Sequence, residues 1–141
     1  MKVLGINGSP RKGGNTEILI RKVFEPLEAA GIETELIQIG GKPIRGCIGC
    51  RKCFENQDKA CIIKTDPVND IIAKMIDADG ILLGSPTYFT DVTAEMKALI
   101  DRAGYVTLAN GCLLKHKVGA AVVAVRRGGA LHVFDTCLLY T

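Results

Sequence analysis

The chain has 141 residues, 48% of them hydrophobic and 23% charged, which is enough apolar sequence to bury the core of one domain. A net charge of +3 and an aromatic content of 5% exclude a typical nucleic-acid-binding surface. No apolar run approaches the roughly 20 residues of a membrane helix and no secretion signal is evident, so we expect a cytoplasmic protein with reduced cysteines and no membrane contact.

The first predicted unit is a strand, a turn and a helix. The segment KVLGINGS predicts a short apolar strand. The segment NTEILIRKVFEPLEAAG then predicts a helix that Asn15 or Thr16 caps and Gly31 ends. Residues 33–39 mix polar and apolar side chains, which is typical of a strand at the edge of a sheet.

The rest of the chain repeats the alternation of helix and strand. Residues 66–80 predict a helix with Asp66 as its cap, and residues 80–86 predict a buried strand. Residues 91–104 predict another helix and residues 117–125 a fourth strand. This order indicates a doubly wound α/β fold with a parallel sheet, in which ligands bind at the carboxyl ends of the strands.

Three loops are expected at those carboxyl ends: GSPRKGGNT, GSPTYFTD and AVRRGGA. In the first, backbone amides around Gly13 and Gly14 at a helix start predict a phosphate site. Its sequence differs from that of the mononucleotide-binding loop, which needs a lysine and a hydroxyl residue at positions 14 and 15, where this chain has Gly14 and Asn15. An ordinary glycine-rich turn remains the alternative, and Tyr88 and Phe89 of the second loop would alternatively cover the end of the core.

The most unusual stretch is the cysteine segment, defined here as residues 42–64. Its cysteines follow the spacing C-x2-C-x2-C-x7-C, and its six basic and two acidic residues give it a charge of +4. Three closely spaced thiolates and a fourth farther on favour a [4Fe-4S] cluster over zinc. Zinc, redox-active thiols and a loop without metal remain alternatives. The candidate ligands are Cys47, Cys50, Cys53 and Cys61.

The chain resembles a known family over Met1 to about Phe134. The two loops GSPRKGGNT and GSPTYF and the stretch EMKALIDR resemble the flavodoxin-like NADPH-dependent FMN reductases, and the cysteine pattern resembles their iron-sulfur flavoprotein branch. The resemblance implies bound FMN, with NAD(P)H as a possible electron donor. It implies phosphate contacts from Ser9, Arg11, Gly14, Asn15 and Thr16, ring contacts from Pro86, Thr87, Tyr88 and Phe89, and contacts near the pyrimidine end from Gly128 and Gly129. It identifies no catalytic acid or base.

These observations predict an electron-transfer flavoprotein that passes electrons between FMN and a [4Fe-4S] cluster. The basic cysteine segment predicts docking of an acidic electron carrier such as ferredoxin, and the family resemblance implies a dimer or tetramer. The alternatives are a non-catalytic flavin-binding remnant and a cluster-free flavin or quinone reductase.

We expect residues 1–141 to form one flavodoxin-like domain with strand order 2-1-3-4. The family pattern continues after RRGG through a fourth helix, a fifth strand and a last helix, and none of these is expected here. The fourth strand would then have an open apolar edge. The sequence therefore predicts either a shortened relative of a longer flavoprotein or self-association that covers this edge.

Overall fold

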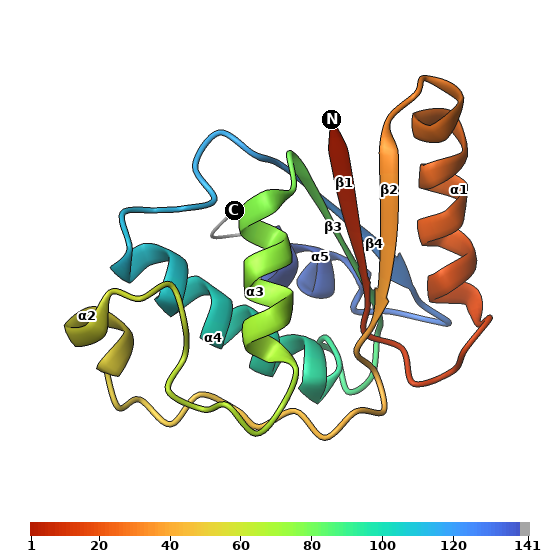
Figure 1. Ribbon diagram of the computed structural model, residues 1–141. Helices are drawn as coiled ribbons and strands as arrows, with labels where there is room; N and C mark the ends of the chain where they lie inside the picture. The colour runs from red at the N-terminus through yellow and green to blue at the C-terminus, as the bar shows by residue number, and fades with distance from the viewer. Residues whose placement is uncertain (139–141) are drawn as a thin grey trace.

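The computed structural model describes residues 1–138 and contains a parallel sheet with helices on both faces (Figure 1). The strands are β1 (Lys2–Asn7), β2 (Glu33–Gln38), β3 (Gly80–Pro86) and β4 (Val118–Ala124). Their order is β2-β1-β3-β4, and every neighbouring pair is parallel. The predicted strand order is thus confirmed, and all four strands end at the same edge of the sheet.

The helices form two layers around this sheet. They are α1 (Asn15–Ala29), α2 (Lys52–Asn56), α3 (Val68–Asp77), α4 (Ala94–Ala109) and α5 (Ala130–Leu138). Helix α1 lies on one face, α3 and α4 lie on the other, and the short α2 lies farthest from the sheet (Figure 1). None of the helices described in residues 1–138 has the length and apolar character needed to cross a membrane.

Helix α1 packs unusually close to the sheet because two strand residues opposite it are glycines. Ile20 and Phe24 are buried against Leu82 of β3. A Cβ atom on Gly5 would lie 2.5 Å from Phe24 Cζ, and one on Gly84 would lie 2.5 Å from Ile20 Cδ1. Neither position therefore accepts a side chain unless the helix moves away from the sheet.

The opposite face of the sheet carries the larger core. Alternate strand residues point to it, since successive side chains of a strand face opposite sides. Apolar residues from three helices cover them, including Ile72 of α3, Leu99 of α4 and Val133 of α5. Strand residues in this core include Leu4, Ile6, Ile81 and Leu83.

Helix α1 ends as the sequence predicts but begins differently. Gly31 has a φ of +76° and its amide donates to Glu28 O at 2.9 Å, as expected for a glycine that follows a helix. At the start the capping position is Gly14, and no side chain there accepts a helical amide. The prediction that Asn15 or Thr16 caps the helix is wrong, and the amides at this end are left for another acceptor.

Three further predictions need correction. A helix, α5, follows RRGG, and it exists because Val133 and Cys137 bury its apolar side against the core. The cysteine segment contains α2, whose five residues are too few to show a helical period in sequence. Pro67 is the capping position of α3, although Asp66 Oδ1 still accepts a hydrogen bond from Val68 N at 3.2 Å.

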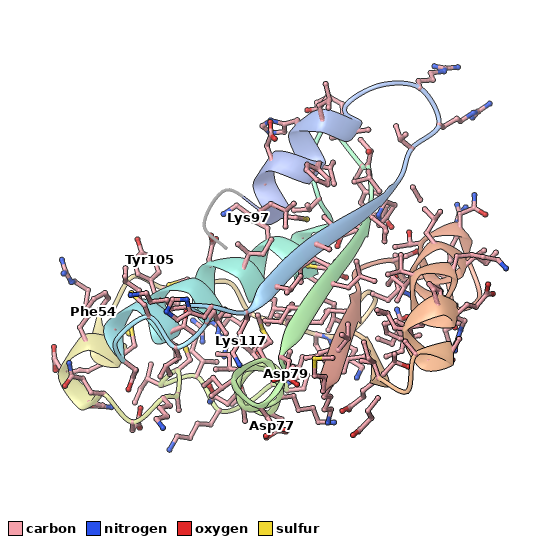
Figure 2. All side chains as sticks on the ribbon, turned by 90° about the horizontal axis from the view of Figure 1, so that it is seen from above. Phe54, Asp77, Asp79, Lys97, Tyr105 and Lys117 are labelled. Atoms are coloured by element: carbon pink, nitrogen blue, oxygen red, sulfur yellow. The ribbon has the colours of Figure 1, made fainter. Side chains whose placement is uncertain are left out.

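At the edge of the sheet where the strands begin, hydrogen bonds connect the strand starts to the end of α3. Lys117 Nζ donates to Ile76 O at 2.8 Å and to Ala78 O at 2.5 Å, at the end of α3. The amide of Lys2 donates to Asp79 Oδ2 at 2.7 Å. Figure 2 shows Lys117, Asp77 and Asp79 together at this end. The opposite edge, where the strands end, is where the candidate ligand loops lie.

Candidate functional site

The loop that follows β1 is shaped by side chains of the strand ends. Asn7 Oδ1 accepts a hydrogen bond from Ser9 N at 3.0 Å, and Ser9 Oγ accepts one from Arg11 N at 3.2 Å. Asn7 Nδ2 in turn donates to Gln38 Oε1 at 2.7 Å. Ser9 is buried and Arg11 is exposed. The roles of Asn7 and Gln38 are not evident from the sequence, because they depend on the pairing of β1 with β2.

The start of α1 presents a set of amides suited to an anion. Gly13 N donates to Glu17 Oε2 at 2.8 Å, and this bond, together with Arg21, holds the pKa of Glu17 below its usual value. The amides of Asn15, Thr16 and Glu17 have no hydrogen-bond acceptor within residues 1–138. One carboxylate already binds at this positive helix end, and free amides remain beside it. The predicted phosphate contacts Gly14, Asn15 and Thr16 lie here.

The second and third loops enclose a cavity of about 220 Å³. Thr87 and Tyr88 line one side and Gly128 lines another, so the structure brings these predicted contacts together. Gly129 has a φ of +89°, and a Cβ atom there would lie 3.0 Å from Thr87 Cγ2. The remaining lining residues are Val125, Arg126 and Arg127.

Within this cavity region one buried polar atom lacks a partner. Thr87 N donates to Ala124 O at 3.0 Å, but the Thr87 hydroxyl oxygen is buried and has no hydrogen bond within the described part of the chain. Buried hydroxyls normally have a partner. A polar edge of a ligand placed between the two loops would provide one.

The aromatic residues of the second loop do not cover the core. Phe89 is 96% exposed and Tyr88 is 57% exposed, whereas Pro86 is half-buried. The alternative in which both rings plug the end of the core is therefore wrong. Tyr88 lines the cavity and Phe89 follows it in the same loop, so two exposed rings at the carboxyl edge of the sheet are available to a planar ligand.

Thr93, which the sequence did not single out, joins the first two loops. Its hydroxyl donates to Gly8 O at 2.9 Å and accepts from Met96 N at 3.4 Å, so it also caps α4. Thr93 N donates to Ser85 Oγ at 3.1 Å, and Gly8 N donates to Gly84 O at 2.7 Å. The loops after β1 and β3 are therefore held side by side.

Replacing Thr93 with valine tests this connection. The side chain keeps its shape but leaves Gly8 O without its buried donor and α4 without its cap, so we expect a loss of about 1–3 kcal/mol in the free energy of unfolding. Urea denaturation measures it. The matched control is Thr65→Val, at an exposed residue, with an expected change of about 0.5 kcal/mol or less. Equal stability of Thr93→Val and the parent would contradict the assignment.

The cysteine segment encloses a second cavity, of about 240 Å³. All four predicted ligands line it, namely Cys47, Cys50, Cys53 and Cys61, and all four are free thiols. Cys47 and Cys50 are exposed, and burial raises the pKa of the half-buried Cys53. Across residues 1–138, no three side chains of Cys, His, Asp or Glu are arranged to hold a metal ion. The structure thus gathers the four thiols around one space without placing them in a coordination geometry.

Aromatic side chains close one side of this cavity. Phe54 of α2 and Tyr105 of α4 lie close together (Figure 2) and make an edge-to-face contact with ring centroids 6.2 Å apart. Arg51 lies over the Phe54 ring at 5.3 Å. Both rings line the cavity. They attach the short α2 to the main body of the fold.

A buried arginine closes the cysteine segment at its base. Arg102 of α4 donates through Nη1 to Arg45 O at 3.0 Å and to Asp66 Oδ2 at 2.5 Å, and through Nη2 to Ile63 O at 2.9 Å. Burial alone would lower the pKa of Arg102, but its hydrogen bond with Asp66 and the nearby Cys61 outweigh it and raise the pKa. Arg102 therefore stays charged and fixes both ends of the segment.

Arg102 was missed as a functional residue, although the sequence holds a signal for it. On a helix it follows Leu99 by three positions and precedes Val106 by four, so it belongs to a stripe of buried apolar residues. A charged residue in such a stripe needs a buried partner. The sequence does not show that this partner is Asp66, 36 positions away.

The fold and the loops define a flavodoxin-like α/β protein with a glycine-rich loop before α1, a cavity between the second and third loops and a separate cysteine-lined cavity. The chain belongs to the NADPH-dependent FMN reductase family, which it matches over residues 1–140. This confirms the family resemblance that the sequence motifs indicate.

Several curated relatives carry the name iron-sulfur flavoprotein. One from Methanocaldococcus jannaschii is 47% identical over 131 residues, which cover 92% of this chain and 65% of the relative. One from Archaeoglobus fulgidus is 37% identical over 142 residues, covering 99% of this chain and 68% of the relative. The chain thus spans about two thirds of the length of these relatives.

Among solved structures, the NAD(P)H:quinone oxidoreductase from Methanothermobacter marburgensis superposes with a TM-score of 0.75 at 15% identity. The superposition covers 99% of this chain and 74% of the other. At this level of identity the likeness concerns the fold alone.

Proposed function

We propose that this chain is an FMN-dependent oxidoreductase that passes electrons between FMN and a [4Fe-4S] cluster held by the cysteine segment, all within one domain of residues 1–141. The main support for FMN binding is that the amides of Asn15, Thr16 and Glu17 have no acceptor within residues 1–138. A dianionic phosphate would accept hydrogen bonds from them directly. Membership of an FMN reductase family supports the same assignment.

The residues of the three loops have different roles in binding the flavin. The helix amides and the exposed Arg11 bind the phosphate, while Ser9, buried beneath, keeps the loop in shape. Tyr88 offers an exposed ring at the cavity, Phe89 offers another in the same loop, and Gly129 lets the third loop approach Thr87. When bound, FMN supplies the electron-transfer chemistry, and the protein positions it. NAD(P)H is the donor we propose on the basis of the family.

The cysteine cavity fits an inorganic group better than an organic one. Its donor set of four thiols is the one that iron-sulfur clusters use. Cys47 and Cys50 are exposed, so a change of side-chain rotamer toward the cavity meets little resistance. The name iron-sulfur flavoprotein, carried by relatives of this chain, supports this half of the proposal.

The surface around the cysteine cavity suits an acidic electron carrier such as ferredoxin. The six basic residues of the cysteine segment are all exposed, namely Lys42, Arg45, Arg51, Lys52, Lys59 and Lys64. Such a concentration of one charge attracts a partner of the opposite charge. We also propose self-association into a dimer or tetramer, because β4 at the sheet edge has no fully buried residue.

A second candidate function is a flavin or quinone reductase without a cluster. The observation in its favour is that the described residues contain no side-chain group already arranged to hold a metal. In that case Cys47, Cys50, Cys53 and Cys61 would remain free thiols. The experiment below separates the two functions.

Flavin and iron analysis tests the proposal. The chain is reconstituted under argon with ferrous iron and sulfide, titrated with FMN by fluorescence quenching, and analysed for iron, acid-labile sulfide and zinc. We expect FMN binding together with iron and sulfide. Serine at Cys47, Cys50, Cys53 or Cys61 should remove the iron and leave FMN affinity unchanged, since the thiols lie outside the flavin loops. Cys112→Ser, at an exposed thiol outside the cysteine segment, is the matched control and should keep its iron.

The outcomes separate the candidates. FMN binding without iron supports the cluster-free reductase. Zinc in place of iron and sulfide supports a zinc site in the cysteine segment. Fluorescence that stays unquenched at saturating protein contradicts the flavin assignment itself.

A further inference from the structure

We infer that Arg102 is a positioning residue that sets the reduction potential of the group held by the four cysteines, by donating its Nε–H to a sulfur atom in their cavity. This inference rests on the proposed cluster. Arg102 is not one of the four cysteines expected to bind the cluster, and its buried ion pair with Asp66 does not by itself require this second role.

The observation behind it is an unsatisfied donor. Arg102 is 1% exposed, and its Nη1 and Nη2 atoms both donate to protein oxygens. Its Nε atom is buried and has no hydrogen-bond partner within residues 1–138. Buried donors are rarely left unpaired, and a charged one least of all. A sulfur atom that comes within reach, or a group bound beside Arg102, is therefore needed to satisfy this donor.

The cavity is the place for that acceptor. Arg102 lines it together with the four cysteines, and its charged group interacts with Cys61. A thiolate or sulfide sulfur accepts hydrogen bonds, and hydrogen bonds to the sulfurs raise the reduction potential of an iron-sulfur cluster. The three bonds from Nη1 and Nη2 hold the guanidinium plane in place, so the direction of the Nε–H is fixed.

The hydrogen bond from Arg102 Nε should change the reduction potential more than the positive charge of Arg102 does. Asp66 Oδ2 lies 2.5 Å from Arg102 Nη1 and offsets much of the positive charge seen from the cavity. The Nε–H has no such partner. Lysine at position 102 would retain a cation beside Asp66 but lose this donor, so the Lys and Gln variants should shift the potential in the same direction and by similar amounts.

The test is a redox titration of the reconstituted protein. Parent, Arg102→Lys and Arg102→Gln are loaded under argon with ferrous iron and sulfide, and the midpoint potential is followed by absorbance against redox dyes. We expect both variants to lower the equilibrium constant for one-electron reduction about tenfold, a shift of about 59 mV to more negative potential. Arg51→Gln is the control, since it removes an exposed charge that lines the same cavity, and its shift should be much smaller.

Each outcome bears on the inference. An unchanged potential in a fully loaded Arg102→Lys protein overturns it and leaves the cluster proposal intact. A parent that takes up FMN but no iron and sulfide overturns both. Because Arg102 is buried and its variants can fail to fold, a second measurement uses the parent labelled with 15N-arginine in an Arg51→Lys background. Hyperfine coupling of an arginine nitrogen to the reduced cluster supports the inference, and its absence overturns it.

Discussion

Replacing Asp66 with asparagine is expected to lower the free energy of unfolding by about 3–5 kcal/mol, because it leaves Arg102 charged and buried without its counter-ion. The side chains of both residues are almost inaccessible, at 2% and 0% exposure. Asp66 also accepts hydrogen bonds from Arg45 N at 3.0 Å and Val68 N at 3.2 Å. The loss of stability should therefore include the contribution of the hydrogen bonds that attach the cysteine segment to Asp66. Urea denaturation measures this loss.

The control for this prediction is an exposed ion pair on α4, the helix that carries Arg102. Asp101 pairs with Lys97 one turn along α4, and their side chains are 39% and 48% exposed. Lys97 is labelled in Figure 2. Asp101→Asn should change stability by about 0.5 kcal/mol or less, since exposed pairs contribute little. Similar losses for both variants would contradict the special role of the buried pair.

The buried pair also makes stability depend on pH in a defined direction. Burial works to raise the pKa of Asp66, but hydrogen bonds from Arg102, Arg45 N and Val68 N outweigh it, so the folded pKa is lowered. Its stabilising contribution is therefore complete above the unfolded pKa of about 3.9 and is lost as pH falls toward the folded pKa. In the asparagine variant this part of the acid dependence should disappear.

The fold follows from the sequence because each of its strands and long helices carries its own pattern. Apolar strands alternate with amphipathic helices, and glycines such as Gly31 mark where helices end. The two helices that were missed have weak local patterns. Helix α2 has five residues, and α5 has nine with no marked start, so their existence depends on contacts made elsewhere, such as Phe54 with Tyr105.

The candidate site is only partly predictable for the same reason. Backbone amides at a glycine-rich helix start and cysteines at regular spacing are local features, and the structure places the predicted thiols around one cavity. Asn7 with Gln38, Thr93 with Gly8, and Arg102 with Arg45 act across 31, 85 and 57 positions. No periodicity connects residues this far apart, and only the sheet register and helix packing bring them together.

Gly40 shows how tightly the end of the second strand holds the loop after β1. It follows β2, and its amide donates to Asn7 O at 3.1 Å. A Cβ atom at this position would lie 2.2 Å from Ser9 C and 2.4 Å from Gly8 O. These are backbone atoms of the loop, so they cannot turn aside as a flexible side chain would. Gln38 adds to the constraint, because its Nε2 atom donates to both Ser9 O and Gly40 O.

Replacing Gly40 with alanine should therefore displace the loop after β1, and with it the amides at the start of α1 that we propose bind the FMN phosphate. We expect a loss of about 1–3 kcal/mol in the free energy of unfolding and a rise of about tenfold in the Kd for FMN, measured by urea denaturation and fluorescence quenching. Gly46→Ala is the matched control, since a Cβ atom there meets nothing within 4 Å. Parental FMN affinity in Gly40→Ala would mean that the loop after β1 does not hold the phosphate.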